Sequence, residues 1–91
     1  MKIYMTDAII GNVGYDYENF RYTFACFTTK ERAYKFFNDL DIHDVAEDFS
    51  INGDIKETNT PEIPNVECYK TYRNQYGDFI HLIIGDTTLD E

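Results

Sequence analysis

The sequence predicts an α+β fold, with a four-stranded, mostly antiparallel sheet in the chain order ββααββ and one or two helices packed on one face. Two observations predict this class. Runs rich in β-branched and aromatic residues stand in pairs near both ends of the chain, and each pair is separated by a turn-forming segment. Between the pairs, apolar residues recur with the 3.6-residue period of helices. With 91 residues, the chain is long enough for one domain, residues 1–91, and too short for two.

The composition is that of a folded protein, although the chain carries a net charge of -9. Hydrophobic residues make up 43% of it, including 8 Tyr and 7 Phe, and this content argues against a disordered chain. The first residues, "MKIYMTDAII", lack the continuous apolar core of a signal peptide, and no run approaches the length of a membrane span. We therefore expect neither export nor membrane association.

The two cysteines predict no disulfide framework and no zinc site. Cys26 and Cys68 are far apart in the sequence, and neither belongs to a Cys-x-x-Cys motif. Both fall within strand-like runs, where a buried thiol behaves as a small hydrophobic side chain. Burial of both thiols and a reducing, cytoplasmic location are the resulting expectations.

The first strand pair consists of "KIYMTDAII", residues 2–10, and "FRYTFACFT", residues 20–28. The glycine- and asparagine-rich segment between them predicts a hairpin with a long loop. In the second run, alternation places Phe20, Tyr22, Phe24 and Cys26 on one face and Arg21, Thr23, Ala25 and Phe27 on the other. Because both faces are partly apolar, this run is predicted to be a central strand.

The first helix is predicted to begin at Thr28, which forms a Thr-x-x-Glu capping box with Glu31. The apolar residues that follow are spaced i, i+3, i+4 and i+7, which is one stripe of a helix. They are Ala33, Phe36, Phe37 and Leu40. We expect this helix to cover one face of the sheet.

The segment "DIHDVAEDF", residues 41–49, predicts a second helix with two distinct faces. On a helical wheel, one side gathers the apolar residues Ile42, Val45, Ala46 and Phe49. The opposite side gathers the acids Asp41, Asp44, Glu47 and Asp48. Like charges spaced i+3 or i+4 cost about 0.2 to 0.5 kcal/mol per pair, so stability alone does not explain this arrangement.

The second strand pair is predicted to be a hairpin near the C-terminus. Its strands are "VECYKTYR", residues 66–73, and "FIHLIIG", residues 79–85, with "NQYGD" as the turn. The preceding segment, residues 52–65, holds both prolines of the chain and is predicted to be a loop.

Negative charge is concentrated between Asp39 and Glu62, where eight acids face Lys56 as the sole base. These acids are the candidate partner-binding residues: Asp39, Asp41, Asp44, Glu47, Asp48, Asp54, Glu57 and Glu62. One interpretation is that they only keep the protein soluble. The other is that they bind a basic surface, since helical carboxylates repeat at about 5 to 6 Å, comparable with phosphates along a nucleic-acid backbone. The second interpretation predicts a DNA mimic.

The chain resembles small phage anti-defence proteins, including DNA mimics of the anti-restriction nuclease type and acidic anti-CRISPR inhibitors. The shared features are its length, the excess of Asp and Glu over Lys and Arg, its richness in Tyr, Phe, Asn and Ile, and the carboxylate face of "DIHDVAEDF". The resemblance implies a phage-encoded inhibitor, acting in the host cytoplasm, that occupies the DNA-binding surface of a restriction, CRISPR or nucleoid protein.

Catalysis, cofactors and metals are not expected. Neither His43 nor His81 accompanies a serine or cysteine in a nucleophile motif, and "GNVG" lacks the spacing of a phosphate loop. The acidic run from Asp39 departs from a calcium-binding loop, because Asp44 replaces the required glycine and Ser50 replaces the final glutamate. Direct nucleic-acid binding is disfavoured as well, because only 8 bases stand against 17 acids.

The expected partner is a DNA-binding protein with a basic surface. The alternative is a non-catalytic adaptor that binds proteins through exposed aromatics such as Tyr15 and Tyr17, with the acids serving solubility only. A homodimer is a further expectation, because a four-stranded open sheet leaves two edges and neither residues 2–10 nor residues 66–73 contain a proline to block pairing.

Overall fold

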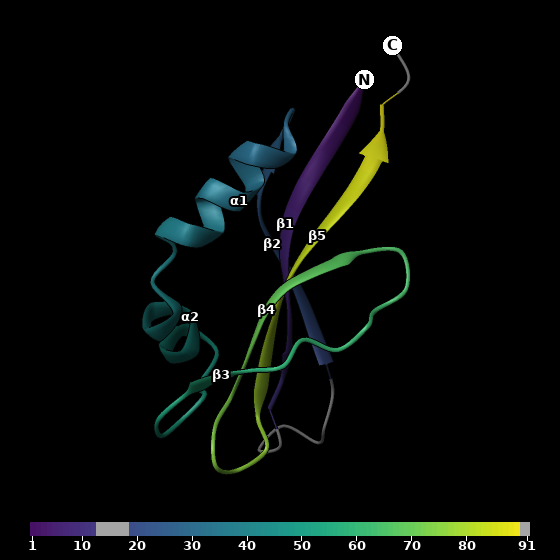
Figure 1. Ribbon diagram of the computed structural model, residues 1–91. Coiled ribbons are helices and arrows are strands. Elements are labelled where there is room, and N and C mark those ends of the chain that lie inside the picture. The colour runs from purple at the N-terminus through teal and green to yellow at the C-terminus, as the bar shows by residue number, and fades with distance from the viewer. Residues whose placement is uncertain (13–18, 90–91) are drawn as a thin grey trace.

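The computed structural model describes residues 1–12 and 19–89 and shows an α+β fold with an antiparallel sheet and two helices (Figure 1). Its elements are β1 (Lys2–Gly11), β2 (Asn19–Phe27), α1 (Lys30–Asp39), α2 (Ile42–Asp48), β3 (Lys56–Thr58), β4 (Glu67–Arg73) and β5 (Phe79–Thr88). The fold class and both helices are as predicted. The prediction of four strands is wrong, because β3 forms within the segment predicted to be a loop and pairs with β4.

The sheet has the strand order β2-β1-β5-β4-β3, and every neighbouring pair is antiparallel. The two predicted hairpins, β1 with β2 and β4 with β5, are both present. They are joined by the pairing of β1 with β5, which is continuous from Lys2 opposite Thr88 to Gly11 opposite Phe79. This long pairing brings the two ends of the chain together, and the Met1 amino group donates a hydrogen bond to the Leu89 carbonyl at 3.1 Å.

Three strands occupy other positions in the sheet than predicted. β2 was expected at the centre but lies at an edge, and most of its residues are exposed. β1 and β4 were expected at the edges, yet β1 lies between β2 and β5, and β4 lies between β5 and β3. The β1–β5 pairing places the N-terminal strand inside the sheet and leaves β2 at one edge, and the pairing of β3 with β4 covers the other side. The edges are therefore β2 and the three-residue strand β3.

A β-bulge in β2 changes which of its residues face the helices. The register with β1 shifts between Thr6 and Asp7, so alternation is interrupted near Phe24. The rings of Phe24 and Phe27 both contact Phe36 of α1, at centroid distances of 5.8 and 5.7 Å, although an uninterrupted strand would place them on opposite faces. Cys26 is consequently exposed, and the prediction that it is buried is wrong.

Both helices pack on one face of the sheet (Figure 1). α1 begins one residue later than predicted, because the side chain of Thr29, not Thr28, accepts the hydrogen bond from the Arg32 amide. The core between helices and sheet is formed by Ala8, Ile10, Ala33, Phe37, Val45, Ala46, Ile51, Ile80, Leu82 and Ile84. None of the helices in the described ranges is both long and apolar enough to cross a membrane.

The opposite face of the sheet has its own buried polar groups. Asp7 is 2% exposed and accepts a hydrogen bond from Arg21 Nε at 2.9 Å. His81 is also buried, and its Nδ1 lies 2.9 Å from the Thr71 hydroxyl. Burial and the nearby Arg73 hold the pKa of His81 below its usual value, because both disfavour the protonated ring.

Candidate functional site

Local interactions at both ends define the short helix α2. At its start, the Asp41 carboxylate accepts a hydrogen bond from the His43 amide at 3.0 Å, which is a typical N-cap. At its end, Ser50 adopts a positive φ of 59°. The Ser50 amide donates a hydrogen bond to the Glu47 carbonyl, and the Ile51 amide donates one to the Ala46 carbonyl. This is a Schellman motif with serine in the position that glycine usually takes.

Asn12 joins this helix end to the sheet. Its side-chain amide donates to the carbonyls of Phe49 and Ser50, at 3.1 and 3.0 Å. Carbonyls at a helix C-terminus lack partners within the helix, so Asn12 supplies one and fixes α2 relative to the end of β1.

The predicted two-faced character of α2 is observed. Val45 and Ala46 are 5% and 6% exposed, and Ile42 and Phe49 are half-buried against the core. The four acids on the other side are all exposed: Asp41, Asp44, Glu47 and Asp48. We call these four residues the α2 acids.

Basic side chains of the described residues form ion pairs with acids outside α2. The ion pairs of the described residues are Lys2–Asp86, Arg21–Asp7, Lys30–Glu67, Lys35–Asp39 and Lys70–Glu57. In one of them, a hydrogen bond from Tyr34 together with the Lys30 charge holds the pKa of Glu67 below its usual range. None of these pairs includes an α2 acid, so the negative charge of α2 is not neutralised within the described chain.

Helix electrostatics explain only the first two α2 acids. Asp41 caps the helix, and Asp44 lies in its first turn, where the helix dipole favours negative charge. Glu47 and Asp48 lie at the opposite end, where the dipole disfavours negative charge, and the last turn contains no basic residue. Local stability therefore gives no reason for these two acids.

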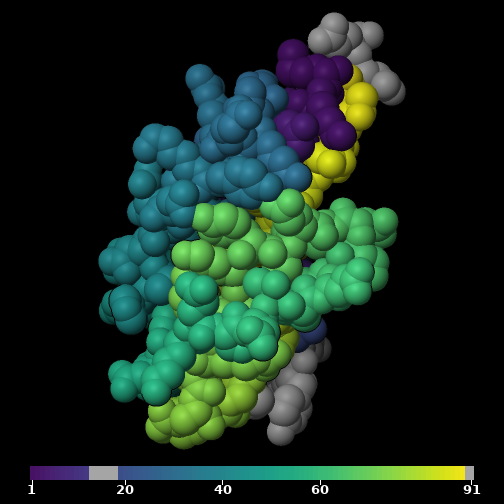
Figure 2. All heavy atoms as spheres, in the orientation of Figure 1, coloured from purple at the N-terminus to yellow at the C-terminus, as the bar shows by residue number. Residues whose placement is uncertain are grey.

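The other predicted site residues do not join the α2 acids. Asp39 pairs with Lys35 at 2.9 Å, and Glu57 on β3 pairs with Lys70 at 3.6 Å. Asp54 lines a separate hollow with Lys56, Arg73, Asn74 and Gln75. Glu62 belongs to the segment between β3 and β4, which projects on the side of the molecule away from both helices (Figures 1 and 2). Tyr15 and Tyr17 lie outside the described residues.

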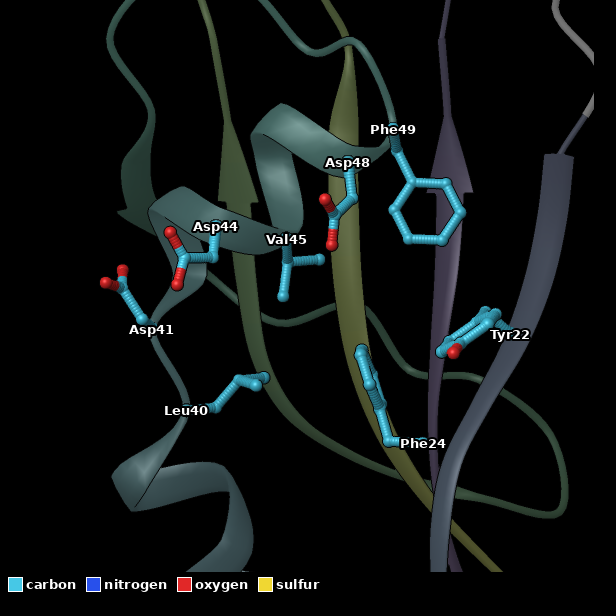
Figure 3. Close-up of a pocket in the computed structure, with 8 residues that line it drawn as sticks. All are labelled: Tyr22, Phe24, Leu40, Asp41, Asp44, Val45, Asp48 and Phe49. Atoms are coloured by element: carbon cyan, nitrogen blue, oxygen red, sulfur yellow. The ribbon is translucent and has the colours of Figure 1, made fainter.

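A cavity of about 340 Å³ opens between α2 and β2. It is lined by Tyr22, Phe24, Leu40, Asp41, Asp44, Val45, Asp48 and Phe49 (Figure 3). Figure 3 shows the Asp48 carboxylate pointing from α2 into the space above Phe24, with Tyr22 and Phe49 on one side and Val45 on the other. A second hollow of about 250 Å³ adjoins it and shares Asp48 and Phe49, with Phe20 as a further wall. We call the two together the α2–β2 groove.

The walls of the groove are aromatic. Tyr22 makes edge-to-face contacts with Phe24 and Phe49, at centroid distances of 5.1 and 5.6 Å. Phe20 and Tyr22 remain 45% and 48% exposed. The sequence analysis did not assign these aromatics to the site. Their alternation along an acid-free strand was visible, but α1 separates β2 from α2 in the sequence, so no sequence signal placed the two elements together.

The α2–β2 groove combines carboxylates with aromatic surface, and neither histidine is among the described residues that line it. His43 is exposed on α2, whereas His81 is buried in the sheet. In the part of the chain that the structure describes, no group of three or more His, Cys, Asp or Glu side chains is placed to hold a metal ion. No protein-family model, curated protein or solved structure matches this chain.

Proposed function

We propose that the protein binds a basic, DNA-contacting surface of another protein through the α2 acids and so competes with DNA for that surface. The observation that carries the proposal is the concentration of exposed carboxylates on α2, none of which forms an ion pair within the described chain. Glu47 and Asp48 also support the proposal, because the helix dipole disfavours negative charge at their positions and helix stability does not account for them. The resemblance to anti-defence proteins favours a host restriction, CRISPR or nucleoid protein as the partner.

The size of α2 limits the extent of such mimicry. A helix of seven residues is about 10 Å long and matches about three phosphates of one DNA strand. The proposed contact is therefore local, with one basic patch of the partner. Asp54, Glu57 and Glu62 contribute to the long-range field that attracts a basic protein, but not to the contact itself.

The test begins with capture of the partner from a host lysate on immobilised protein, followed by purification of the captured protein. The proposal predicts that the partner binds double-stranded DNA and that adding this protein displaces the DNA. It also predicts that complex formation weakens steeply with salt, because the interaction is between charges. A captured partner that holds DNA and this protein at the same time would contradict the proposal.

A second candidate function is the adaptor that binds proteins through aromatic residues. The exposure of Phe20 and Tyr22 on β2 favours it. Changing Asp44, Glu47 and Asp48 to Asn or Gln separates the two functions, since an adaptor retains its partner, whereas an acidic mimic loses most of its salt-dependent affinity.

A further inference from the structure

We propose that the α2–β2 groove receives an arginine side chain of the basic partner, so that one guanidinium group lies against the Tyr22 ring and pairs with Asp48. This inference rests on the proposed function and names the chemistry of the contact. It also unites the acidic and the aromatic surfaces, which the sequence presented as alternatives.

The charge of the groove selects a cation. Three of its lining residues, Asp41, Asp44 and Asp48, carry carboxylates, and none of the described residues that line the cavity is basic. Asp48 is exposed, and its carboxylate is directed toward the cavity (Figure 3). Asp44 lies one helical turn before it, so both carboxylates line the same side of the space.

The aromatic walls select arginine among cations. The planar guanidinium stacks on aromatic rings and forms paired hydrogen bonds with a carboxylate, whereas the lysine ammonium is compact and strongly hydrated. Tyr22 offers a half-exposed ring in the same cavity that Asp48 lines, so both interactions are available within one cavity. A cavity of about 340 Å³ is at the lower end of the range for small-molecule sites, which suits one long side chain.

The groove is already formed before a partner arrives. Tyr22 is held by its ring contacts with Phe24 and Phe49, and Asn12 fixes the end of α2 by hydrogen bonds to Phe49 and Ser50. An arriving side chain therefore has few protein groups to order, which reduces the entropic cost of binding.

The experiment uses the full chain and two short peptides of equal length and net charge, one carrying arginines and the other lysines. Binding is followed at low ionic strength by NMR of isotope-labelled protein, with the signals of Tyr22, Phe24 and Val45 as reporters. We expect the arginine peptide to bind about fivefold more tightly than the lysine peptide and to shift these signals. In Tyr22→Ile, which keeps an apolar side chain, the arginine peptide should lose about fivefold in affinity and the preference should disappear.

Matched controls separate the groove from general effects. Tyr76→Ile removes a ring that is 59% exposed in the β4–β5 turn and should change neither affinity. Asp48→Asn should weaken both peptides, whereas Glu62→Gln removes one charge outside the groove and should have a smaller effect. Circular dichroism verifies that each variant is folded.

Each of the remaining outcomes overturns the inference. Equal affinity for both peptides, unchanged in Tyr22→Ile, would mean that α2 acts through charge alone, and the proposed function would stand. Binding of tetramethylammonium that depends on Tyr22, without a preference between the peptides, would identify a site for a small quaternary ammonium ion instead. Failure of both peptides to bind would overturn the proposed function as well.

Discussion

The carboxylate of Asp48 lies in the last turn of α2, where the helix dipole already concentrates partial negative charge. It also lies one turn after Asp44, a like charge. Binding and stability therefore place opposite demands on this residue, because the feature that attracts a cation to the groove also weakens the helix. Asp41 differs, because its carboxylate stabilises the helix as the N-cap and also contributes negative charge to the groove.

Replacing Asp48 by Asn is expected to raise the free energy of unfolding by about 0.3 to 1 kcal/mol, because the repulsion by the dipole and by Asp44 disappears. Urea denaturation of wild type and variant measures the change. Asp44→Asn is the control and should gain less, because Asp44 lies in the favourable first turn. A loss of stability in Asp48→Asn would show that its carboxylate makes a stabilising contact within the protein.

His81 predicts a dependence of stability on pH. Burial and Arg73 hold its folded-state pKa below 6.5, so the unfolded chain takes up a proton before the folded chain does. The free energy of unfolding should therefore fall as the pH decreases from about 7 toward the folded-state pKa, by at most about 1.4 kcal/mol per pH unit for this single proton. The measurement is urea denaturation across that range, with His81→Gln expected to flatten the decrease. An unchanged profile in the variant would assign the decrease to other groups.

Among the elements, α2 was the most predictable from the sequence, and β2 and β3 were the least. The period of α2 is uninterrupted, so a helical wheel separates its buried and exposed residues correctly. In β2, the bulge near Phe24 shifts the alternation by one residue, and no local signal announces it. β3 has only the residues Lys-Glu-Thr, with no apolar alternation, and forms because β4 offers it a partner.

The end of α2 predicts a stabilising substitution. Ser50 occupies the left-handed region with φ of 59°, which costs a residue with a Cβ about 1 kcal/mol relative to glycine. Ser50→Gly should therefore raise the free energy of unfolding by up to about 1 kcal/mol in urea denaturation, without changing the charge of the groove. If the variant were less stable than wild type, the Schellman motif would not describe this helix end in solution.

For the whole molecule, the sequence predicted the two hairpins and the acidic helix but not how they are assembled. The β1–β5 pairing joins segments from opposite ends of the chain, and such contacts leave no periodic signal. The same pairing decides which strands are edges. The acidic stretch from Asp39 to Glu62 does not form one surface, because the segment after β3 projects away from both helices (Figure 1).

The edge strand β2 makes a dimer the expected assembly. It has nine residues without proline, lysine or acids, and its Phe20 and Tyr22 are exposed, whereas the β3 edge is too short to pair extensively. Salt at about 0.15 M screens repulsion between the acidic copies beyond about 8 Å. Antiparallel pairing of two β2 strands would bring two α2–β2 grooves into one assembly.

Sedimentation equilibrium at physiological salt tests this dimer. We expect a species of twice the 10.7 kDa chain mass, and Phe20→Lys should return it to the monomer by placing charge on the edge. A wild-type mass of 10.7 kDa at high micromolar concentration would exclude the dimer.

The central claim is that the α2 acids, and not the overall negative charge, form the binding surface. Two variants with the same loss of charge test it most directly. One changes Asp44, Glu47 and Asp48 to Asn or Gln and keeps the Asp41 cap, and the other changes Glu31, Glu62 and Asp86 to Gln or Asn.

The measurement is the affinity of each variant for the purified partner by isothermal titration calorimetry at physiological salt. We predict that the first variant loses at least about tenfold in affinity, corresponding to about 1.4 kcal/mol, while the second stays close to wild type. Equal losses in both variants, or no loss in either, would contradict the claim.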